Sequence, residues 1–356
     1  MEAHLKNTFF AVAAAALALA GCGQSATGGD AGEGGGRQEI RIVGSSTVYP
    51  FTQAVAERFA QANASGRAPV VESTGTGGGI ELFCAGVGAD HPDIANASRR
   101  IKDTEIATCA ENGVTRIIEI PVGIDGLALI ESVERPTNFQ LTSRDIYAAL
   151  AANPFGRPQT ARTWRDVNPE LPDVAIMVYG PPPTSGTRDS FAELILDEGC
   201  DSDPAMVALK EEDSDRHEEV CRTIREDGAF VEAGENDNLL MQRVAANQGA
   251  IGVLGYSFLA ENAELVKGIS IDGVAPSVGT IQDFSYPGAR QLYIYVKGEH
   301  LDVIPGLREF LAEYARAWSE GGYLAERGLI PSPADVQQRA AEAIRNPTPI
   351  TAADLQ

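Results

Sequence analysis

Several kinds of catalytic and metal-binding motif are missing from this sequence of 356 residues. It has four histidines, none of them at metal-ligand spacing to another, and no His-Glu-x-x-His motif. It has no Gly-x-Ser-x-Gly nucleophile motif and no Gly-Lys-Ser/Thr loop. The five cysteines include no Cys-x-x-Cys pair, which argues against zinc. We therefore expect no metal, no cofactor and no catalytic residue, and a binding protein in place of an enzyme.

Positive charge is also scarce, with 28 Lys and Arg against 50 Asp and Glu and a net charge of −22. This balance excludes a nucleic-acid-binding protein that depends on phosphate contacts. Residues 193–237 alone hold 16 acidic and 4 basic side chains, and we expect them to form a solvated helical face, not a site. Salt screens the overall field within about 10 Å, so local N–H groups decide whether an anion binds.

The N-terminal segment is typical of a targeting signal. The apolar run from Phe9 to Ala20 is too short for a permanent transmembrane helix. The sequence Leu-Ala-Gly-Cys that ends at Cys22 resembles the bacterial lipobox. We expect a signal peptide over 1–22, lipidation of Cys22 and a flexible Gly-rich tether over 23–37. A plain signal peptide with an incidental cysteine is the alternative; lipidation would put the protein in the periplasm or cell envelope, anchored to the membrane.

Export permits disulfides. With Cys22 used for the anchor, four cysteines remain, and they allow three connectivities. We expect the local one, Cys84 with Cys109 and Cys200 with Cys221. Loops of that size would each add roughly 3 kcal/mol of stability in the chain-entropy model.

A glycine-rich stretch from Gly75 to Glu81 predicts a strand–loop–helix junction. The strand is expected over 70–73, and the helix begins near Ile80. Bare N–H groups and the positive end of a helix dipole favour an anion at such a junction, where Thr76 adds a hydroxyl and Gly77 a free backbone. A merely flexible loop is the alternative interpretation.

Two further junctions of this kind are expected. Ser46 and Thr47 follow a strand at 39–43 and precede a helix, although they could simply cap it. Ser185, Gly186, Thr187 and Arg188 follow an apolar strand at 174–179. Three helix ends, each with about half a positive charge, could offset most of a divalent anion.

The remaining pattern predicts an α/β fold. A short strand at 93–97 delivers Ser98 and Arg99 at its carboxyl end, where ligands bind in such folds. A guanidinium there would suit a tetrahedral oxyanion, although a surface arginine is the alternative. Separate strands are expected at 115–122 and 126–130, and the segment beyond Ile344 is expected to be loose.

Four strings together carry a family resemblance: GSSTVYPF, TGTGGGIELFCAG, DIANASRRI and PTSGTRDSF. They resemble the periplasmic phosphate-binding proteins, the substrate-binding proteins of the phosphate ABC transporter, over about 39–330. The resemblance implies an α/β, two-lobed periplasmic-binding-protein fold of type II, with mixed sheets flanked by helices and a ligand cleft between the lobes. We expect lobe 1 at 38–121 plus about 272–330, lobe 2 at 122–271 and a C-terminal tail at 331–356.

The resemblance also implies which residues bind phosphate. These are Thr47 and the backbone of Val48, Thr76, and Ser185 with Gly186 and Thr187. Two departures stand out, because the family's Asp after the third-motif Ser is here Arg99, and its Arg four residues before the Ser of SGT is here Pro181. The positive charge is therefore expected on Arg99 or Arg188, and Asp125 is the candidate for the missing carboxylate, with a structural role in its turn as the alternative.

The expected function is capture of inorganic phosphate and delivery to an ABC permease, by a monomer with a lipid anchor. Other tetrahedral oxyanions (sulfate, arsenate or molybdate) remain open because the family's Asp is missing. A phosphohydrolase, or a surface sensor or adhesion protein on the same scaffold, is a further alternative, although no base or metal ligand supports catalysis.

Overall fold

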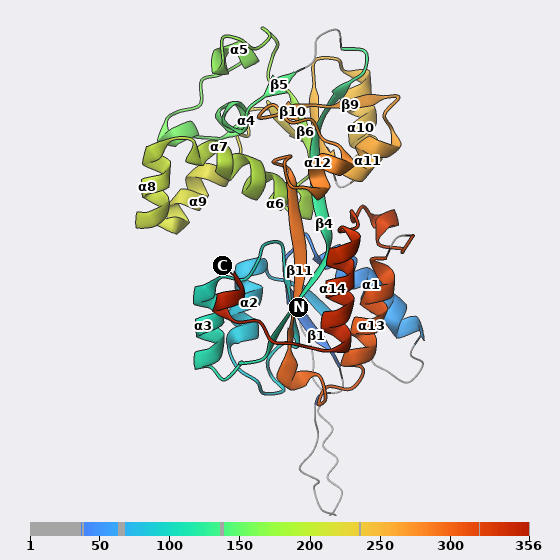
Figure 1. Cartoon of the computed structure of the whole chain (residues 1–356). Coiled ribbons are helices and arrows are strands. Elements are labelled where there is room, and N and C mark those ends of the chain that lie inside the picture. The colour runs from blue at the N-terminus through green and yellow to red at the C-terminus, as the bar shows by residue number, and fades with distance from the viewer. Residues whose placement is uncertain are drawn as a thin grey trace, which may run out of the picture. The chain divides into compact units, whose positions relative to one another are not determined.

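One long strand, β4 (Ile117–Ser132), runs through both halves of the main sheet. The computed structural model describes residues 37, 39–62, 68–135, 139–234, 236–319 and 321–355. In it β4 pairs antiparallel with β11 (Ala289–Lys297), as Figure 1 shows. The expectation of two strands here was wrong: Gly123 and Gly126 do not form a turn, because they pair with Leu292 and Ala289 of β11.

The main sheet of the described residues has nine strands, in the order β2-β1-β3-β11-β4-β8-β6-β7, with β9 also on β4. In the first half β1 is parallel to β2 and β3, whereas β11 is antiparallel to β3. In the second half β6 is parallel to β7 and β8, and β8 and β9 are antiparallel to β4. The other strands are β1 (Arg41–Gly44), β2 (Val70–Ser73), β3 (Ile94–Ala97), β5 (Gln140–Leu141), β6 (Val178–Gly180), β7 (Phe230–Glu232), β8 (Ile251–Gly255), β9 (Val266–Gly268) and β10 (Ser270–Ile271), where β5 and β10 form a separate pair.

Helices flank both halves, so the protein has a mixed α/β fold with two lobes (Figure 1). The first lobe carries α1 (Tyr49–Ala62), α2 (Thr76–Cys84), α3 (Asp103–Glu111), α13 (Leu307–Ala317) and α14 (Ala334–Arg345). The second lobe carries α4 (Ser143–Leu150), α5 (Trp164–Val167), α6 (Gly186–Phe191), the π-helix η2 (Ala192–Leu196), α7 (Asp197–Asp201), α8 (Pro204–Glu212), α9 (Ser214–Arg222), α10 (Asp237–Ala246), α11 (Tyr256–Glu261) and α12 (Val278–Gln282). Short 3-10 turns lie at Pro154–Gly156, Gly298–His300, Ala325–Arg327 and Ala352–Leu355.

Each lobe has its own apolar core. In the first lobe α1 and α13 pack through Phe59 and Phe310, whose rings meet edge to face at 5.7 Å. In the second lobe Phe139 and Trp164 pack at 5.4 Å within a larger cluster. Burial of these aromatic residues together with the more numerous aliphatic ones stabilises each core.

The expected signal peptide and lipobox lie outside the described residues, and so does the expected tether apart from Arg37, which forms an ion pair with Asp93. The described helices include none with the length and apolar character required to cross a bilayer. The C-terminal tail expected at 331–356 contains α14, which packs against the first lobe and buries Ala340. The expectation of a loose segment beyond Ile344 was wrong, because the N–H of Ile350 donates to the carbonyl oxygen of Ile117 at 2.8 Å and Leu355 packs against the first lobe.

Two local disulfides join neighbouring helices. Cys84 of α2 is bonded to Cys109 of α3, and Cys200 of α7 to Cys221 of α9. All four cysteines are buried. Each bridge therefore closes a loop within one lobe.

The helix α2 lies unusually close to β1 because glycines meet there. A Cβ at Gly79 would lie 2.3 Å from the Cα of Gly44, which real side chains do not allow. Gly75 precedes α2 with φ of 73°, a left-handed value that favours glycine. The glycine-rich stretch is therefore required by packing as well as by its bare backbone.

Candidate functional site

Two cavities open between residues of the first lobe and residues of the second, with volumes of about 430 and 440 Å³. Three of the residues expected from the sequence line the first: Thr76, Ser98 and Arg99. Six line the second: Ser46, Thr47, Asp125, Ser185, Gly186 and Thr187. The expected residues thus gather at the lobe boundary but are divided between two cavities.

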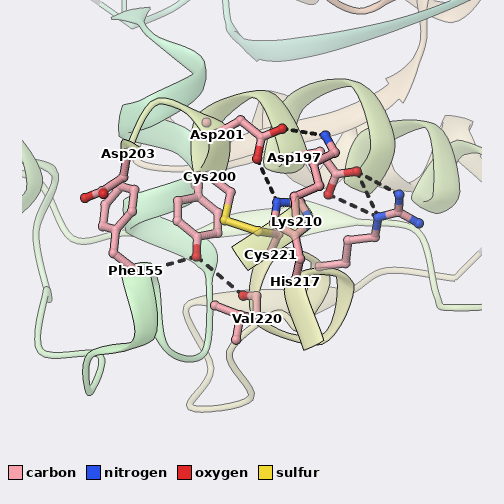
Figure 2. The surroundings of a disulfide bond; sticks show 12 residues. Phe155, Asp197, Cys200, Asp201, Asp203, Lys210, His217, Val220 and Cys221 are labelled. Atoms are coloured by element: carbon pink, nitrogen blue, oxygen red, sulfur yellow. Dashed lines mark hydrogen bonds and ion pairs between the residues drawn. A yellow bond between two sulfur atoms is a disulfide. The ribbon is translucent and has the colours of Figure 1, made fainter. Parts of the chain in front are cut away.

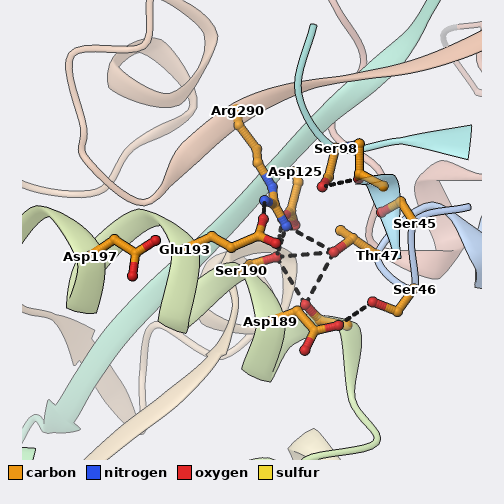
Figure 3. Close-up of polar contacts among 12 residues, drawn as sticks. Ser45, Ser46, Thr47, Ser98, Asp125, Asp189, Ser190, Glu193, Asp197 and Arg290 are labelled. Atoms are coloured by element: carbon orange, nitrogen blue, oxygen red, sulfur yellow. Dashed lines mark hydrogen bonds and ion pairs between the residues drawn. The ribbon is translucent and has the colours of Figure 1, made fainter. Parts of the chain in front are cut away.

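Arg290 of β11 lies between the groups that line the two cavities (Figure 3). Its Nη2 donates to Thr47 Oγ1 at 2.8 Å and to Ser190 Oγ at 2.6 Å. Its Nε donates to Asp125 Oδ2 at 3.3 Å, and its Nη1 forms an ion pair with Glu193. The residue is 8% exposed, so its charge is almost fully withdrawn from water.

The pairing of β4 with β11 sets this arrangement. Arg290 and Asp125 are direct partners in the antiparallel register. Partners in such a pair place their side chains on the same face of the sheet, close enough for an ion pair. Asp125 therefore reaches the guanidinium from the neighbouring strand, not from the turn that the sequence suggested.

Hydroxyl groups from both lobes surround the guanidinium. Thr47 follows β1 and donates to the carbonyl oxygen of Gly186 at 3.2 Å. Ser190 lies in α6 and donates to Asp125 Oδ2 at 2.6 Å. Ser46 donates to the carboxylate of Asp189, so a second polar contact crosses between the lobes beside the first.

The backbones of the two lobes approach closely at Gly186. A Cβ at this position would lie 2.8 Å from Thr47 Cα and 3.0 Å from the carbonyl oxygen of Ser46. The close backbone approach requires glycine here. Since Ser185 caps α6 by accepting a hydrogen bond from the N–H of Thr187, the loop before the helix is held in place locally.

The hydroxyl groups of Thr76 and Ser98 form a separate pair within the first lobe. Their oxygens lie 2.9 Å apart, and the N–H of Ser98 donates to Thr76 Oγ1 at 3.1 Å. Thr76 begins α2, and Ser98 follows β3. Both side chains are buried at the edge of the first cavity.

Arg99 already has a strong partner. It forms a two-bond ion pair with Glu105, with distances of 2.7 and 3.0 Å. The hydrogen bond to Glu105 raises the pKa of Arg99, although partial burial opposes it. Its side chain is 36% exposed and lines the first cavity, so a ligand in that cavity would meet a guanidinium held by a carboxylate.

Other expected residues lie differently. The guanidinium of Arg188 stacks over the Phe230 ring at 4.5 Å and donates to the carbonyl oxygen of Pro181 at 3.0 Å. Desolvation lowers the pKa of Arg188. Val48 has a fully buried side chain, and its N–H donates to Ser45 Oγ at 3.4 Å. Gly77 lies in the first turn of α2, with open space where a side chain would be.

Three residues of the Arg290 cluster were not expected from the sequence: Arg290 itself, Ser190 and Glu193. The interpretation of residues 193–237 as a solvated face was wrong for Glu193, because its carboxylate contacts Arg290. Ser190 lies in the quoted string PTSGTRDSF, one turn after Gly186, so helical spacing could have found it. Arg290 is the second residue of β11, and nothing in the sequence around it marks it as a ligand residue.

The described residues contain one group with metal-like donor geometry, in the second lobe (Figure 2). The ligand atoms of Cys200, His217 and Cys221 lie within 4.8 Å of one another. Both sulfurs are joined in the disulfide, and His217 Nε2 is 2.7 Å from Asp201 Oδ1. The group therefore offers no thiolate to a metal.

Comparison with known sequences finds consistent relatives. A PBP superfamily domain model matches residues 29–317. The chain is 34% identical over 318 residues to Protein SphX of Synechococcus elongatus, covering 87% of this chain and 82% of that protein. It is 30% identical over 322 residues to the phosphate-binding protein PstS of Staphylococcus saprophyticus, covering 87% and 86%.

Comparison with solved structures gives the same fold. A possible phosphate binding protein from Planctomyces limnophilus aligns with a TM-score of 0.70 and 29% identity, over 86% of this chain and 98% of that one. An ABC-type phosphate transport receptor from Vibrio cholerae aligns with a TM-score of 0.55 and 23% identity, over 82% and 99%. The second likeness supports the two-lobed fold alone.

Proposed function

We propose a function from one premise: the chain belongs to the PBP superfamily, among the substrate-binding proteins of phosphate ABC transporters. As a member, it captures inorganic phosphate outside the cytoplasm for uptake through an ABC permease. The named relatives are binding proteins of transporters, not enzymes.

The observation that carries this proposal is the Arg290 cluster. A guanidinium offers its N–H groups in a planar fork that matches two oxygens of a tetrahedral anion. Hydroxyls from the first lobe (Thr47) and the second lobe (Ser190) meet at that fork. An anion held there would contact both lobes, which is how a ligand favours closure.

The remaining contacts are proposed around this centre. Thr47, the Val48 N–H, and Thr76 with Ser98 would supply donors from the first lobe, and Ser185, Gly186 and Thr187 from the second. Gly77 would offer its N–H at the start of α2. Each hydrogen bond to a charged oxygen contributes roughly 1.5–3 kcal/mol before the costs of binding.

The proposed source of positive charge is Arg290, with Arg99 in support. Arg99 would have to share or leave Glu105 to reach the ligand. Arg188 would have to leave the Phe230 ring, so its direct role is the weakest of the three. Ser46 would act by holding the lobes together through Asp189.

Asp125 is proposed to tell phosphate from sulfate. Its carboxylate lies within the cluster and already accepts hydrogen bonds from Arg290 and Ser190. Such an acceptor can receive the proton that hydrogen phosphate carries, whereas it repels an anion that has none.

The proposed setting is the cell envelope. Lipidation of Cys22 would anchor the chain, and residues 23–37 would tether the lobes within reach of the permease. A single chain supplies all the proposed contacts, so we propose a monomer.

Isothermal titration of the ligand-free protein tests the proposal. Phosphate is expected to bind with a stoichiometry of one, and sulfate much more weakly at the same pH. Arsenate, which also carries a proton, should resemble phosphate. Absence of heat with phosphate would reject phosphate capture, and tighter binding of sulfate or molybdate would assign the cleft to another oxyanion.

A further inference from the structure

Three carboxylates follow one another at four-residue spacing along the continuous helical run α6–η2–α7: Asp189, Glu193 and Asp197 (Figure 3). Each has a different partner. Asp189 accepts from Ser46, Asp197 is paired with Arg222, and Glu193 is paired with Arg290. Glu193 is thus the one whose partner is the centre of the proposed phosphate site.

The donors of Arg290 are nearly all in use. A guanidinium has five N–H groups. One on Nε, one on Nη1 and both on Nη2 already bond to Asp125, Glu193, Thr47 and Ser190. Among these contacts a single N–H, on Nη1, is left over. An oxyanion that binds two neighbouring N–H groups must therefore displace a protein group.

Exposure indicates which group is displaced. The Glu193 side chain is 35% exposed, whereas that of Asp125 is 17% exposed. Thr47 and Ser190 are buried. Glu193 lines the first cavity together with Arg290, so its carboxylate can regain hydration when it leaves more readily than the less exposed groups can.

The Glu193 carboxylate also interacts electrostatically with two other guanidinium groups, those of Arg99 and Arg222. It raises the pKa of Arg99, although less than the hydrogen bond to Glu105 does. It also contributes to the raised pKa of Arg222, whose main support is Asp197. Its negative charge therefore acts on three guanidinium groups that line one cavity.

The backbone that carries Glu193 is also unusual. Residues 192–196 form a five-residue π-helix between two α-helices. Such single π-turns are rare and are found mostly at functional sites. The wider turn changes the direction in which side chains project from the helix. Here the side chain of Glu193 points toward Arg290 (Figure 3).

We infer that Glu193 is a tethered anion that occupies Arg290 in the ligand-free protein and competes with the incoming phosphate, so that it lowers and sets the affinity. The inference rests on the proposed function of the same cleft. It assigns to Glu193 the opposite role from that of Asp125: Asp125 stays and contacts the ligand, whereas Glu193 leaves.

The test is titration of phosphate into the wild type, Glu193→Gln and Glu193→Ala. Removal of the competing charge should tighten binding about fivefold, the upper range for a partly exposed ion pair. Ala should tighten it at least as much as Gln, because it leaves no group to bond Arg290. Glu198→Gln removes the same charge from an exposed position in α7 and should leave the affinity within about twofold.

The outcomes separate cleanly. Unchanged or weaker binding in both Glu193 variants, with thermal unfolding like that of the wild type, overturns the inference but leaves phosphate capture intact. An equal gain in Glu198→Gln also overturns it, because the effect would then be one of overall charge. A wild type that binds neither phosphate nor sulfate rejects the proposed function itself.

Discussion

Arg290 shares one guanidinium among two carboxylates and two hydroxyls, in a place where water scarcely reaches. Leaving part of such a cluster unpaired costs more than the intact pair contributes, because a buried charge remains without compensation. The residue lies 243 positions from Thr47 in the chain. Because of this separation, the sequence motifs that contain the hydroxyls predicted Arg99 or Arg188 as the source of positive charge, and not Arg290.

Replacement of Arg290 by Gln should weaken phosphate binding by about 10- to 100-fold, the loss expected for one or two charge-assisted hydrogen bonds. Lys should also bind more weakly than Arg, because an ammonium cannot present two N–H groups in a fork. Titration calorimetry measures both. Arg308→Gln, an exposed change on α13, serves as the control. Wild-type affinity in Arg290→Gln would remove this residue from the site.

Replacement of Thr76 by Val should weaken phosphate binding by about tenfold, because it removes a hydroxyl and leaves the Ser98 N–H without its acceptor. The shape of the side chain is nearly kept. Thr108→Val, on the exposed face of α3, is the matched control. If the two variants bind phosphate equally well, Thr76 has no contact with the ligand.

At the scale of elements, the sequence indicated the strand–helix junctions well, because local patterns determine them. β1, β2 and β6 each lead into a helix, as expected. The expected start of the second helix near Ile80 was wrong, because α2 begins at Thr76 and the glycines form its first turn.

The sequence failed where pairing partners decide the outcome. Gly123 and Gly126 suggested a turn, but the neighbouring β11 keeps β4 extended through them. Glu193 likewise belonged to an acidic stretch by composition, and only the fold shows that it lies next to Arg290.

The two disulfides should contribute similarly to stability, since they close loops of 25 and 21 residues. Replacement of Cys200 and Cys221 by Ser should lower the free energy of unfolding by about 3 kcal/mol in the chain-entropy model. Chemical denaturation measures the loss, with the Cys84/Cys109 double variant for comparison. An unchanged denaturation midpoint in both double variants would show that neither disulfide stabilises the fold by reducing the conformational entropy of the unfolded chain.

At the scale of the whole molecule, the free energy of unfolding depends on pH, because folding makes the charged form of a partly buried carboxyl group less favourable. Burial raises the pKa of Asp237 to about 6, from an ordinary value of 3.8. The folded protein therefore holds this proton more tightly than the unfolded chain. The stability that results is complete below about pH 4 and is lost as the pH rises through about 6.

Asp237→Asn should remove this loss. The variant should be more stable than the wild type at pH 7–8, by about 1 kcal/mol once solvent access is allowed for, and the difference should vanish near pH 4. Thermal unfolding across this range measures it. Asp90→Asn, at an exposed turn, should show no such trend. A difference between Asp237→Asn and the wild type that does not change with pH would contradict the assignment.

The chain enters the second lobe along β4 and returns along β11, and the two strands are neighbours with Gly126 beside Ala289. The second lobe is therefore an insertion between two antiparallel strands, β4 and β11, that are neighbours in the sheet of the first lobe. Excision of that insertion and its replacement by a two-residue reverse turn would preserve the strand order β2-β1-β3-β11-β4 of the parent lobe. The second lobes of relatives could therefore be exchanged by joining the chains at Gly126 and Ala289. Such an exchange would be one way to change the ligand preference, in evolution or by protein engineering.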